Sequence, residues 1–158
     1  LKAEDVPTKL AVTKDDGSAI ESDININGKI YKSTAVSMGN PHSIIFVDSF
    51  DKMDPPFSVV GPLVESHEMF PEDVNAEFVE VLNSKHLNMK VWERGAGPTL
   101  ACGTGACAVC VAGVLTGRSE RECTITLPGG DLYIKWKESD GKLYMTGPAD
   151  EVFRGTFI

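Results

Sequence analysis

A run of small and apolar residues in the second half of the chain constrains the fold more than any other feature. Residues 104–116 read TGACAVCVAGVLT, so a helix built from them has small or apolar side chains on all sides. A helix without a polar face must be buried on most sides. Gly117 follows directly and predicts the end of the helix, because glycine readily adopts the left-handed conformation found there. We therefore predict one central helix that the rest of the chain encloses.

The uncharged run 95–117 has the length of a membrane span, but its composition argues against one. It contains glycines, threonines and a proline, and its compact apolar part is only 106–115. A helix over 106–115 would cover about 15 Å, half of a bilayer core of about 30 Å. The net charge of −8 also disfavours anionic membranes and nucleic acid, which both attract basic patches. We predict neither membrane nor nucleic acid as a partner.

Most of the remaining chain reads as short strands. Asn27-Gly28 lies between two alternating segments, which is a strong hairpin signal. Period-2 alternation or short apolar runs predict further strands, whereas Pro and Asp make 51–62 a loop before a short helix around 62–68. The predicted strands are 23–26, 29–36, 43–48, 75–82, 87–92, 123–127, 132–136, 142–146 and 151–158. The fold class that follows is α+β: a curved, barrel-like, mostly antiparallel β structure around one buried central helix.

Cys102 stands directly before the central helix, in a Cys-Gly-Thr-Gly turn. The first N–H groups of a helix lack intrahelical partners, and the helix dipole places partial positive charge there. Such a site can bind a carboxylate, and we expect it to lower the pKa of the cysteine. A thiolate beside a bound carboxylate can reach the adjacent carbon. The pattern therefore predicts proton abstraction α to a carboxylate, with Cys102 as general base or acid.

Cys102 has two other interpretations. It can be a buried structural cysteine at a glycine-rich helix cap. Together with Cys107, Cys110 and Cys123 it can also ligate a [2Fe–2S] cluster, because the first three match the spacing of plant-type ferredoxins. Cys107 and Cys110 fall inside the apolar helix, however, where they resemble packing residues. A colourless, iron-free protein would exclude the cluster, and we expect the four cysteines to be reduced thiols.

Four polar residues are further candidates for the site. Glu93 and Arg94 end a predicted strand a few residues before Cys102, and an arginine there could bind a second substrate carboxylate. Asn40 and His42 lie in a Gly-Asn-Pro-His turn before a buried strand, where the histidine could serve as acid, base or polar wall. The three histidines of the chain show no paired spacing, so we predict no metal site.

Five segments together resemble the diaminopimelate epimerase family. They are GNPHSIIFVD (39–48), PEDVNAEF (71–78), ERGAGPTLACGTGACA (93–108), LPGGDLYIKW (127–136) and MTGPADEVFRGTF (145–157). The resemblance covers nearly the whole chain in the family's order. It implies a fold of two pseudo-symmetric halves, each a curved β structure around a central helix, of which this chain is similar to the C-terminal one.

The resemblance also implies a reaction. The family inverts one α-carbon of diaminopimelate without pyridoxal phosphate or another cofactor, using two cysteines that face each other across that carbon. Cys102 resembles the second of these cysteines, and Gly103 and Thr104 resemble the amide donors to the reacting carboxylate. The other cysteine, in an Asn-Gly-rich turn of the first half, has no counterpart here. We therefore expect this chain alone to bind substrate weakly and not to epimerise it.

Further roles carry over by position. Asn40, Asn75 and Arg94 resemble residues that hold the distal end of the substrate. Glu93 and His42 resemble catalytic polar partners near the thiols, and Glu93 is also expected to touch the substrate. Pro98 departs from the family, in which many members have a glutamate there; that glutamate does not take part in the chemistry.

The resemblance implies a domain division and a set of partners. Residues 1–147 form the C-terminal epimerase domain, and 148–158 are a terminal strand that packs against the absent half. The expected partners are diaminopimelate, that half, and a second copy in a homodimer. The expected location is cytoplasmic, or the plastid stroma in a plant or alga, in lysine and cell-wall precursor synthesis. A related racemase with another substrate, such as a proline-type racemase, and a non-catalytic binding domain stay open.

Overall fold

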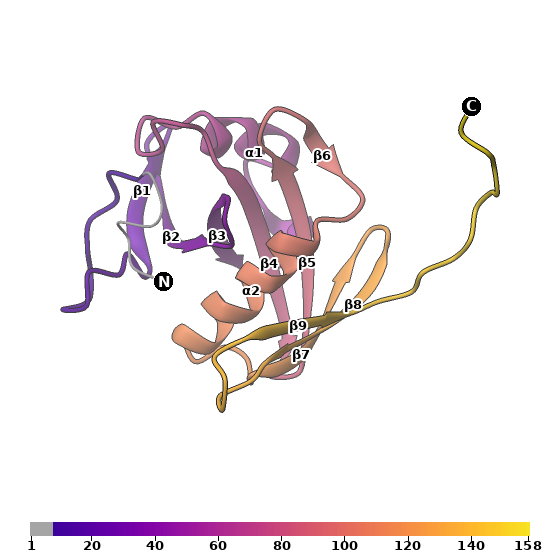
Figure 1. The fold of residues 1–158 in the computed structure, drawn as a ribbon. Coiled ribbons are helices and arrows are strands. Elements are labelled where there is room, and N and C mark those ends of the chain that lie inside the picture. Colours follow the sequence, from indigo (N-terminus) through magenta and orange to yellow (C-terminus); the bar gives the residue numbers. More distant parts are fainter. Residues whose placement is uncertain (1–7) are drawn as a thin grey trace.

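The computed structural model describes residues 8–158 and contains one curved sheet wrapped around a helix (Figure 1). The longest helix, α2, lies in the hollow of the sheet, as the sequence predicts. The elements in chain order are β1 (Ser22–Ile26), β2 (Lys29–Ser37), β3 (Pro41–Val47), the 3-10 helix η2 (Phe50–Lys52), α1 (Phe57–Glu65), β4 (Asn75–Asn83), β5 (His86–Glu93), β6 (Gly97–Thr99), α2 (Gly103–Leu115), β7 (Glu122–Leu127), β8 (Gly130–Trp136) and β9 (Leu143–Thr146).

The nine strands form a single open sheet in the order β1-β2-β3-β4-β5-β7-β8-β9, with β6 paired to β5. Two of the pairs, β3–β4 and β5–β7, are parallel, and the others are antiparallel. Parallel neighbours need a long crossover connection. Here α1 lies in the connection from β3 to β4, and α2 in the connection that leads to β7. The predicted α+β class with a curved, mostly antiparallel sheet is confirmed.

Two hydrophobic cores hold the helices on the sheet. In the first core, α2 contacts β2, β3, β4, β7, β8 and β9. Its alanines, glycines and Val109 are buried there. Because most of these side chains are small, strands can approach the helix from several sides. In the second core, α1 packs with β1 and β4, and Phe70 and Phe78 fill the space between. No helix in residues 8–158 is long and apolar enough to cross a membrane.

The predicted helix around 62–68 was wrong in its position. Helix α1 begins at Phe57 and has Pro62 in its interior rather than in its first turn. Val60, Gly61 and Val64 are buried on one face, and a Cβ at Gly61 would lie 2.9 Å from the Trp92 ring. This close packing outweighs the unfavourable interior proline, so much of the predicted loop is helical.

The C-terminal segment differs from the sequence-based expectation. Residues 151–158 form no strand and are exposed throughout, although a strand was predicted there. Figure 1 shows this segment running away from the body after β9. An isolated strand has no partner for its backbone hydrogen bonds, so alternation alone does not make a strand. The packing of 148–158 against another domain stays a prediction.

Candidate active site

Cys102 is the N-cap residue of α2, which agrees with its predicted place at the mouth of the central helix. Its backbone is extended, and its sulfur accepts a hydrogen bond from the Gly105 N–H at 3.3 Å. The Thr104 Oγ1 lies 3.6 Å from the same sulfur. The side chain is nearly buried, with 8% of its surface exposed. The thiol is therefore held at the helix start with two donor groups in reach.

The predicted lowering of the Cys102 pKa was wrong. Burial raises the pKa of the Cys102 thiol above its ordinary value, and the carboxylates of Glu77 and Glu93 raise it further. The hydrogen bonds from Thr104 and Gly105 act in the opposite direction but are outweighed. Helix-start donors stabilise a thiolate only where burial does not cost more. At neutral pH this thiol keeps its proton, which suits the acid half of a proton exchange.

A buried histidine–carboxylate pair lies next to the thiol. His42 belongs to β3 rather than to the preceding turn, and Glu77 belongs to the adjacent parallel strand β4. Neither side chain is exposed, and His42 Nδ1 lies 2.6 Å from Glu77 Oε1. Burial raises the pKa of Glu77 to about 7, against the lowering effect of His42.

Glu77 was missed as a site residue by the sequence reasoning. The only signal for it is a charged residue between Ala76 and Phe78 in a strand whose first five residues are all buried. A Cβ on Gly105 would lie 2.8 Å from Glu77 Oε1 and 3.1 Å from Cys102 Sγ. Only the absence of a side chain at this position lets the helix start come so close to both groups.

Asn40 links the histidine to the helix start. Its Oδ1 lies 3.0 Å from His42 Nε2, and its Nδ2 donates to Thr104 Oγ1 at 3.3 Å. The structure therefore brings together four predicted residues from two distant segments: Asn40, His42, Cys102 and Thr104. Gly103, the first residue of α2, lies beside them. A Cβ added at Gly103 would lie 3.1 Å from the Met145 side chain.

Glu93, Asn75 and Arg94 lie at the neighbouring strand ends. Glu93 Oε1 accepts a hydrogen bond from Thr99 Oγ1 at 2.6 Å. Asn75 donates to the Pro41 carbonyl at 2.9 Å and accepts from the Arg94 backbone N–H at 3.0 Å. Asn75 thus ties the start of β3 to the end of β5. The exposed Arg94 guanidinium donates to the Glu72 carbonyl at 3.0 Å, so it lies at the surface.

Glu65, at the end of α1, supports the turn after Arg94 and was not singled out from the sequence. Its Oε1 accepts from the Gly95 N–H at 2.6 Å, and its Oε2 accepts from Trp92 Nε1 at 2.8 Å. Trp92 lies near the end of β5 and Gly95 lies in the turn that follows, so one carboxylate joins the strand end to the turn before β6.

Replacing Glu65 by alanine is expected to lower the free energy of unfolding of the intact protein by about 1–3 kcal/mol, because two donors lose a charged acceptor. Urea denaturation measures this loss. Glu68→Ala is the matched control, because Glu68 is exposed just beyond the same helix. Equal stabilities of the two variants would contradict the role of Glu65.

The cysteines beyond Cys102 are packing residues. Cys110 and Cys123 are buried in the first core, and Cys107 packs against it. Cys102 and Cys110 are eight residues apart along α2, a rise of about 12 Å, too far to share one [2Fe–2S] cluster. Residues 8–158 hold no group of three or more potential metal ligands. The cluster interpretation of Cys102 is therefore not supported by the geometry.

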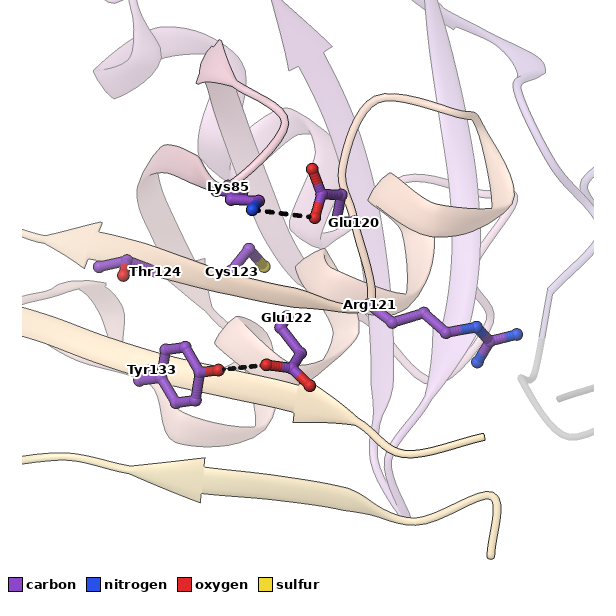
Figure 2. A pocket seen from close by; sticks show the side chains of 7 residues that line it. All are labelled: Lys85, Glu120, Arg121, Glu122, Cys123, Thr124 and Tyr133. Atoms are coloured by element: carbon purple, nitrogen blue, oxygen red, sulfur yellow. Dashed lines mark hydrogen bonds and ion pairs between the residues drawn. The ribbon is translucent and has the colours of Figure 1, made fainter. Parts of the chain in front are cut away.

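A surface hollow of about 500 Å³ lies elsewhere, at the β7–β8 hairpin (Figure 2). Its charged groups are engaged with one another: Lys85 Nζ lies 3.5 Å from Glu120 Oε2, and the Tyr133 hydroxyl donates to Glu122 at 2.6 Å. Arg121 turns away from the others and stacks 4.3 Å from the Trp136 ring. None of the residues described above around Cys102 lines this hollow.

Solved structures share the fold at low sequence identity. The crystal structure of the Bacillus anthracis phenazine biosynthesis protein of the PhzF family aligns with a TM-score of 0.51 and 20% identity, covering 73% of this chain and 38% of that chain. A PhzF-family protein from Enterococcus faecalis aligns with a TM-score of 0.51 and 15% identity, covering 68% and 40%. These likenesses concern the fold alone.

Sequence comparisons are more specific. The family model described as diaminopimelate epimerase matches residues 34–152. The chain is 52% identical to a chloroplastic diaminopimelate epimerase of Oryza sativa subsp. japonica, covering 100% of this chain and 46% of that protein. It is 54% identical to the diaminopimelate epimerase of Synechococcus elongatus, covering 99% and 54%. The chain thus spans about half the length of the curated relatives it matches. By the family match and these identities, the chain belongs to the diaminopimelate epimerase family.

Proposed function

We propose that this chain is the C-terminal half of an enzyme that inverts one α-carbon of diaminopimelate without a cofactor. The observation that carries the proposal is Cys102 at the start of a buried helix, with the Gly105 N–H and the Thr104 hydroxyl beside its sulfur. This arrangement lies within the segment that the family model matches. The relatives are twice as long, so the activity belongs to the intact protein.

Inversion requires acid/base groups on both faces of the carbon. One thiolate removes the α-proton from one face, the electron pair stays on the carbon and its carboxylate, and a second thiol returns a proton from the opposite face. A single group acting on one face would regenerate the same stereoisomer. Cys102 supplies one of the two thiols, and the half absent from this chain supplies the other.

The helix start stabilises the charge that develops during the reaction. The backbone N–H groups of Gly103 and Thr104 lie in the first turn of α2, where intrahelical acceptors are lacking. They hold the α-carboxylate of the substrate, whose oxygens gain negative charge when the α-proton leaves. The Gly105 N–H is already used by the Cys102 sulfur, so it supports the thiolate instead.

The distal end of the substrate meets the neighbouring strand ends. Asn40, Asn75 and Arg94 hold its amino and carboxylate groups, and Glu93 and His42 act as polar partners near the thiols. Asn75 and Arg94 lie together at the end of β5, because Asn75 accepts from the Arg94 backbone N–H, whereas Asn40 contacts Thr104 at the helix start. The Arg94 side chain has to leave the Glu72 carbonyl to reach a substrate in this site.

The proposed wider setting is the one that the resemblance to the family implies. The reaction serves lysine and cell-wall precursor synthesis, in the cytoplasm or, in a plant or alga, in the plastid stroma. The Oryza sativa relative is chloroplastic, which fits the second location. Residues 148–158 pack against the other half; the exposed Val152, Phe153 and Phe157 support this, since large apolar side chains left in water favour a partner surface. A homodimer completes the expected assembly.

The chain expressed alone is expected to give no deuterium uptake at the substrate α-carbon in D2O. One thiol cannot invert the carbon, and exchange on a single face is not expected either, because the surface that would close the site is absent from this chain. Nuclear magnetic resonance of the recovered diaminopimelate measures the uptake, and circular dichroism checks that the chain is folded. The intact protein is the positive control and should exchange and invert. Sustained inversion by the chain alone would overturn the one-thiol proposal, and no inversion by the intact protein would overturn the proposed reaction.

A further inference from the structure

Glu77 is the one fully buried carboxylate of the described residues, and it has no role in the mechanism above. Its Oε1 lies 2.6 Å from His42 Nδ1, and its buried Oε2 has no hydrogen-bond partner within residues 8–158. An ionised carboxylate in this position would be costly, because burial without full hydrogen bonding disfavours charge. The short contact between His42 Nδ1 and Glu77 Oε1 therefore favours a proton held between the two atoms.

The neighbouring hydrogen bonds fix the number of protons on the pair. Asn40 donates from Nδ2 to Thr104 Oγ1, so its Oδ1 faces His42 Nε2 and requires a hydrogen on that nitrogen. The contact between His42 Nδ1 and Glu77 Oε1 must then hold one more proton, on either atom, because two bare acceptors would repel. The pair is neutral as a unit in both arrangements. Burial also raises the pKa of Glu77 to about 7, so this carboxyl can hold a proton near neutral pH.

A directed chain of hydrogen bonds leads from this pair to the sulfur. His42 Nε2 donates to Asn40 Oδ1, and Asn40 Nδ2 donates to Thr104 Oγ1. Since the Thr104 hydroxyl accepts from Asn40, its own hydrogen is free to point to Cys102 Sγ at 3.6 Å. Glu77 also lies near the sulfur, because a Cβ on Gly105 would touch both groups.

We propose that Glu77 is a positioning residue for proton transfer at Cys102: it shares one proton with His42 and thereby fixes the direction of the hydrogen-bond chain that ends on the sulfur. The functional part of this inference rests on the proposed role of Cys102 in proton exchange. The hydrogen-bond chain itself rests only on the geometry. Because Glu77 acts through other residues, its effect is seen in the titration of the thiol.

The ionisable groups that face Glu77 are His42 from β3, Glu93 from β5 and Cys102 at the start of α2. Met89 and Gly105 also lie close to Glu77, and neither carries a charge. When the pH rises, the Glu77–His42 pair can lose its shared proton and become negative, which opposes ionisation of the neighbouring thiol. Thiolate formation at Cys102 is then spread over a wide pH range and shifted upward.

In Glu77→Gln the amide can donate to His42 Nδ1 and keep the chain intact, but the pair can no longer become negative. The intact protein is treated with iodoacetamide over a range of pH, and mass spectrometry of the Cys102 peptide gives the alkylation rate. We expect the apparent pKa of Cys102 to fall by about one unit or more in Glu77→Gln, with a single-proton curve, because a like charge disfavours ionisation. Glu80→Gln, in the same strand but bonded to the Phe50 N–H, should keep the wild-type curve.

Glu77→Leu removes the carboxyl group, so His42 Nδ1 loses its hydrogen-bond partner. In this variant we expect kcat for inversion to fall about tenfold or more with KM little changed, because a misplaced reacting group slows the chemical step. Glu77→Gln should restore most of the rate. An unchanged alkylation curve in Glu77→Gln would overturn the proposal. If Glu77→Gln shows the expected alkylation shift but the wild-type protein does not act on diaminopimelate, the proposed function is overturned and the hydrogen-bond chain is left standing.

One measurement needs no variant. Proton magnetic resonance of the intact wild-type protein should show a far-downfield, solvent-protected resonance from the proton shared by His42 Nδ1 and Glu77. It should broaden and disappear when the pH rises through the titration of the pair. The absence of such a resonance near neutral pH would overturn the shared-proton pair even if the variants failed to fold.

Discussion

Replacing Cys102 by alanine in the intact protein is expected to lower the rate of diaminopimelate inversion by about 10²–10⁴-fold or more, the usual share of a positioned acid/base group. The substitution removes the group that serves one face of the α-carbon, and no other thiol in this chain can take its place. Cys107 and Cys110 point from later turns of α2 into packing contacts. Chromatographic separation of the diaminopimelate stereoisomers measures the rate directly.

Cys107→Ala is the matched control for this substitution. Cys107 lies in the same helix, five residues after Cys102, and packs against the same core. The control should keep nearly the full rate at about the wild-type melting temperature. Equal loss of activity in the two variants would show that α2 is sensitive to any cysteine replacement, and retained inversion in Cys102→Ala would remove this thiol from the reaction.

Gly105→Ala is the second substitution with a large expected effect. An added methyl group would lie 2.8 Å from Glu77 Oε1, 3.1 Å from Cys102 Sγ and 3.2 Å from Met89 Cε. Contacts this short force the helix start away from the histidine–carboxylate pair. Alanine would favour a helix by about 1 kcal/mol over glycine, but overpacking of a core commonly costs about 1–3 kcal/mol. We expect a net loss of stability together with a loss of inversion of about 100-fold, the size found for misplacement of reacting groups by about 1 Å.

Thermal unfolding and the inversion rate together test Gly105→Ala. Gly113→Ala makes the same change in the same helix at a distance from Cys102. There the added methyl group meets the Ser119 hydroxyl at 2.2 Å, which rotation of the serine side chain can relieve, and the Ser119 Cβ at 3.0 Å, which rotation leaves in place. Some loss of stability is therefore expected in this variant too, but away from the thiol. Gly113→Ala should therefore keep its inversion rate. A fully active Gly105→Ala would contradict the close approach of Cys102 and Glu77 to one backbone position.

The central helix and most strands could be predicted from the sequence because their patterns are local. The absence of a polar face in α2 and the period-2 alternation of β7 and β8 identify buried faces without knowledge of their partners. Helix α1 could not be placed, because its stability depends on Gly61 fitting under Trp92, which joins distant segments. The strand predicted over 151–158 failed for the converse reason: its alternation has no neighbouring strand to pair with here.

Most residues of the candidate site could be predicted from the sequence, but the direction of the Cys102 pKa shift could not. The turn at Cys102 and the Asn40–His42 segment were recognisable, and the structure brings them together. The pKa of Cys102 moves opposite to the prediction because burial and the carboxylates of Glu77 and Glu93 outweigh the helix start. Those carboxylates come from β4 and β5, and their distance from the thiol depends on the parallel pairing of β3 with β4 and on a glycine in α2. Neither can be read from local sequence.

Deuterium exchange by the intact Cys102→Ala protein, with each stereoisomer of the substrate offered separately in D2O, tests the two-thiol proposal most directly. Inversion should be lost for both stereoisomers. Exchange without inversion should survive, if at all, only for the stereoisomer whose α-hydrogen faces the remaining thiol, since that group can still remove and return a proton on its own face. Continued inversion, or equal exchange of both stereoisomers, would contradict the assignment of one face of the carbon to Cys102.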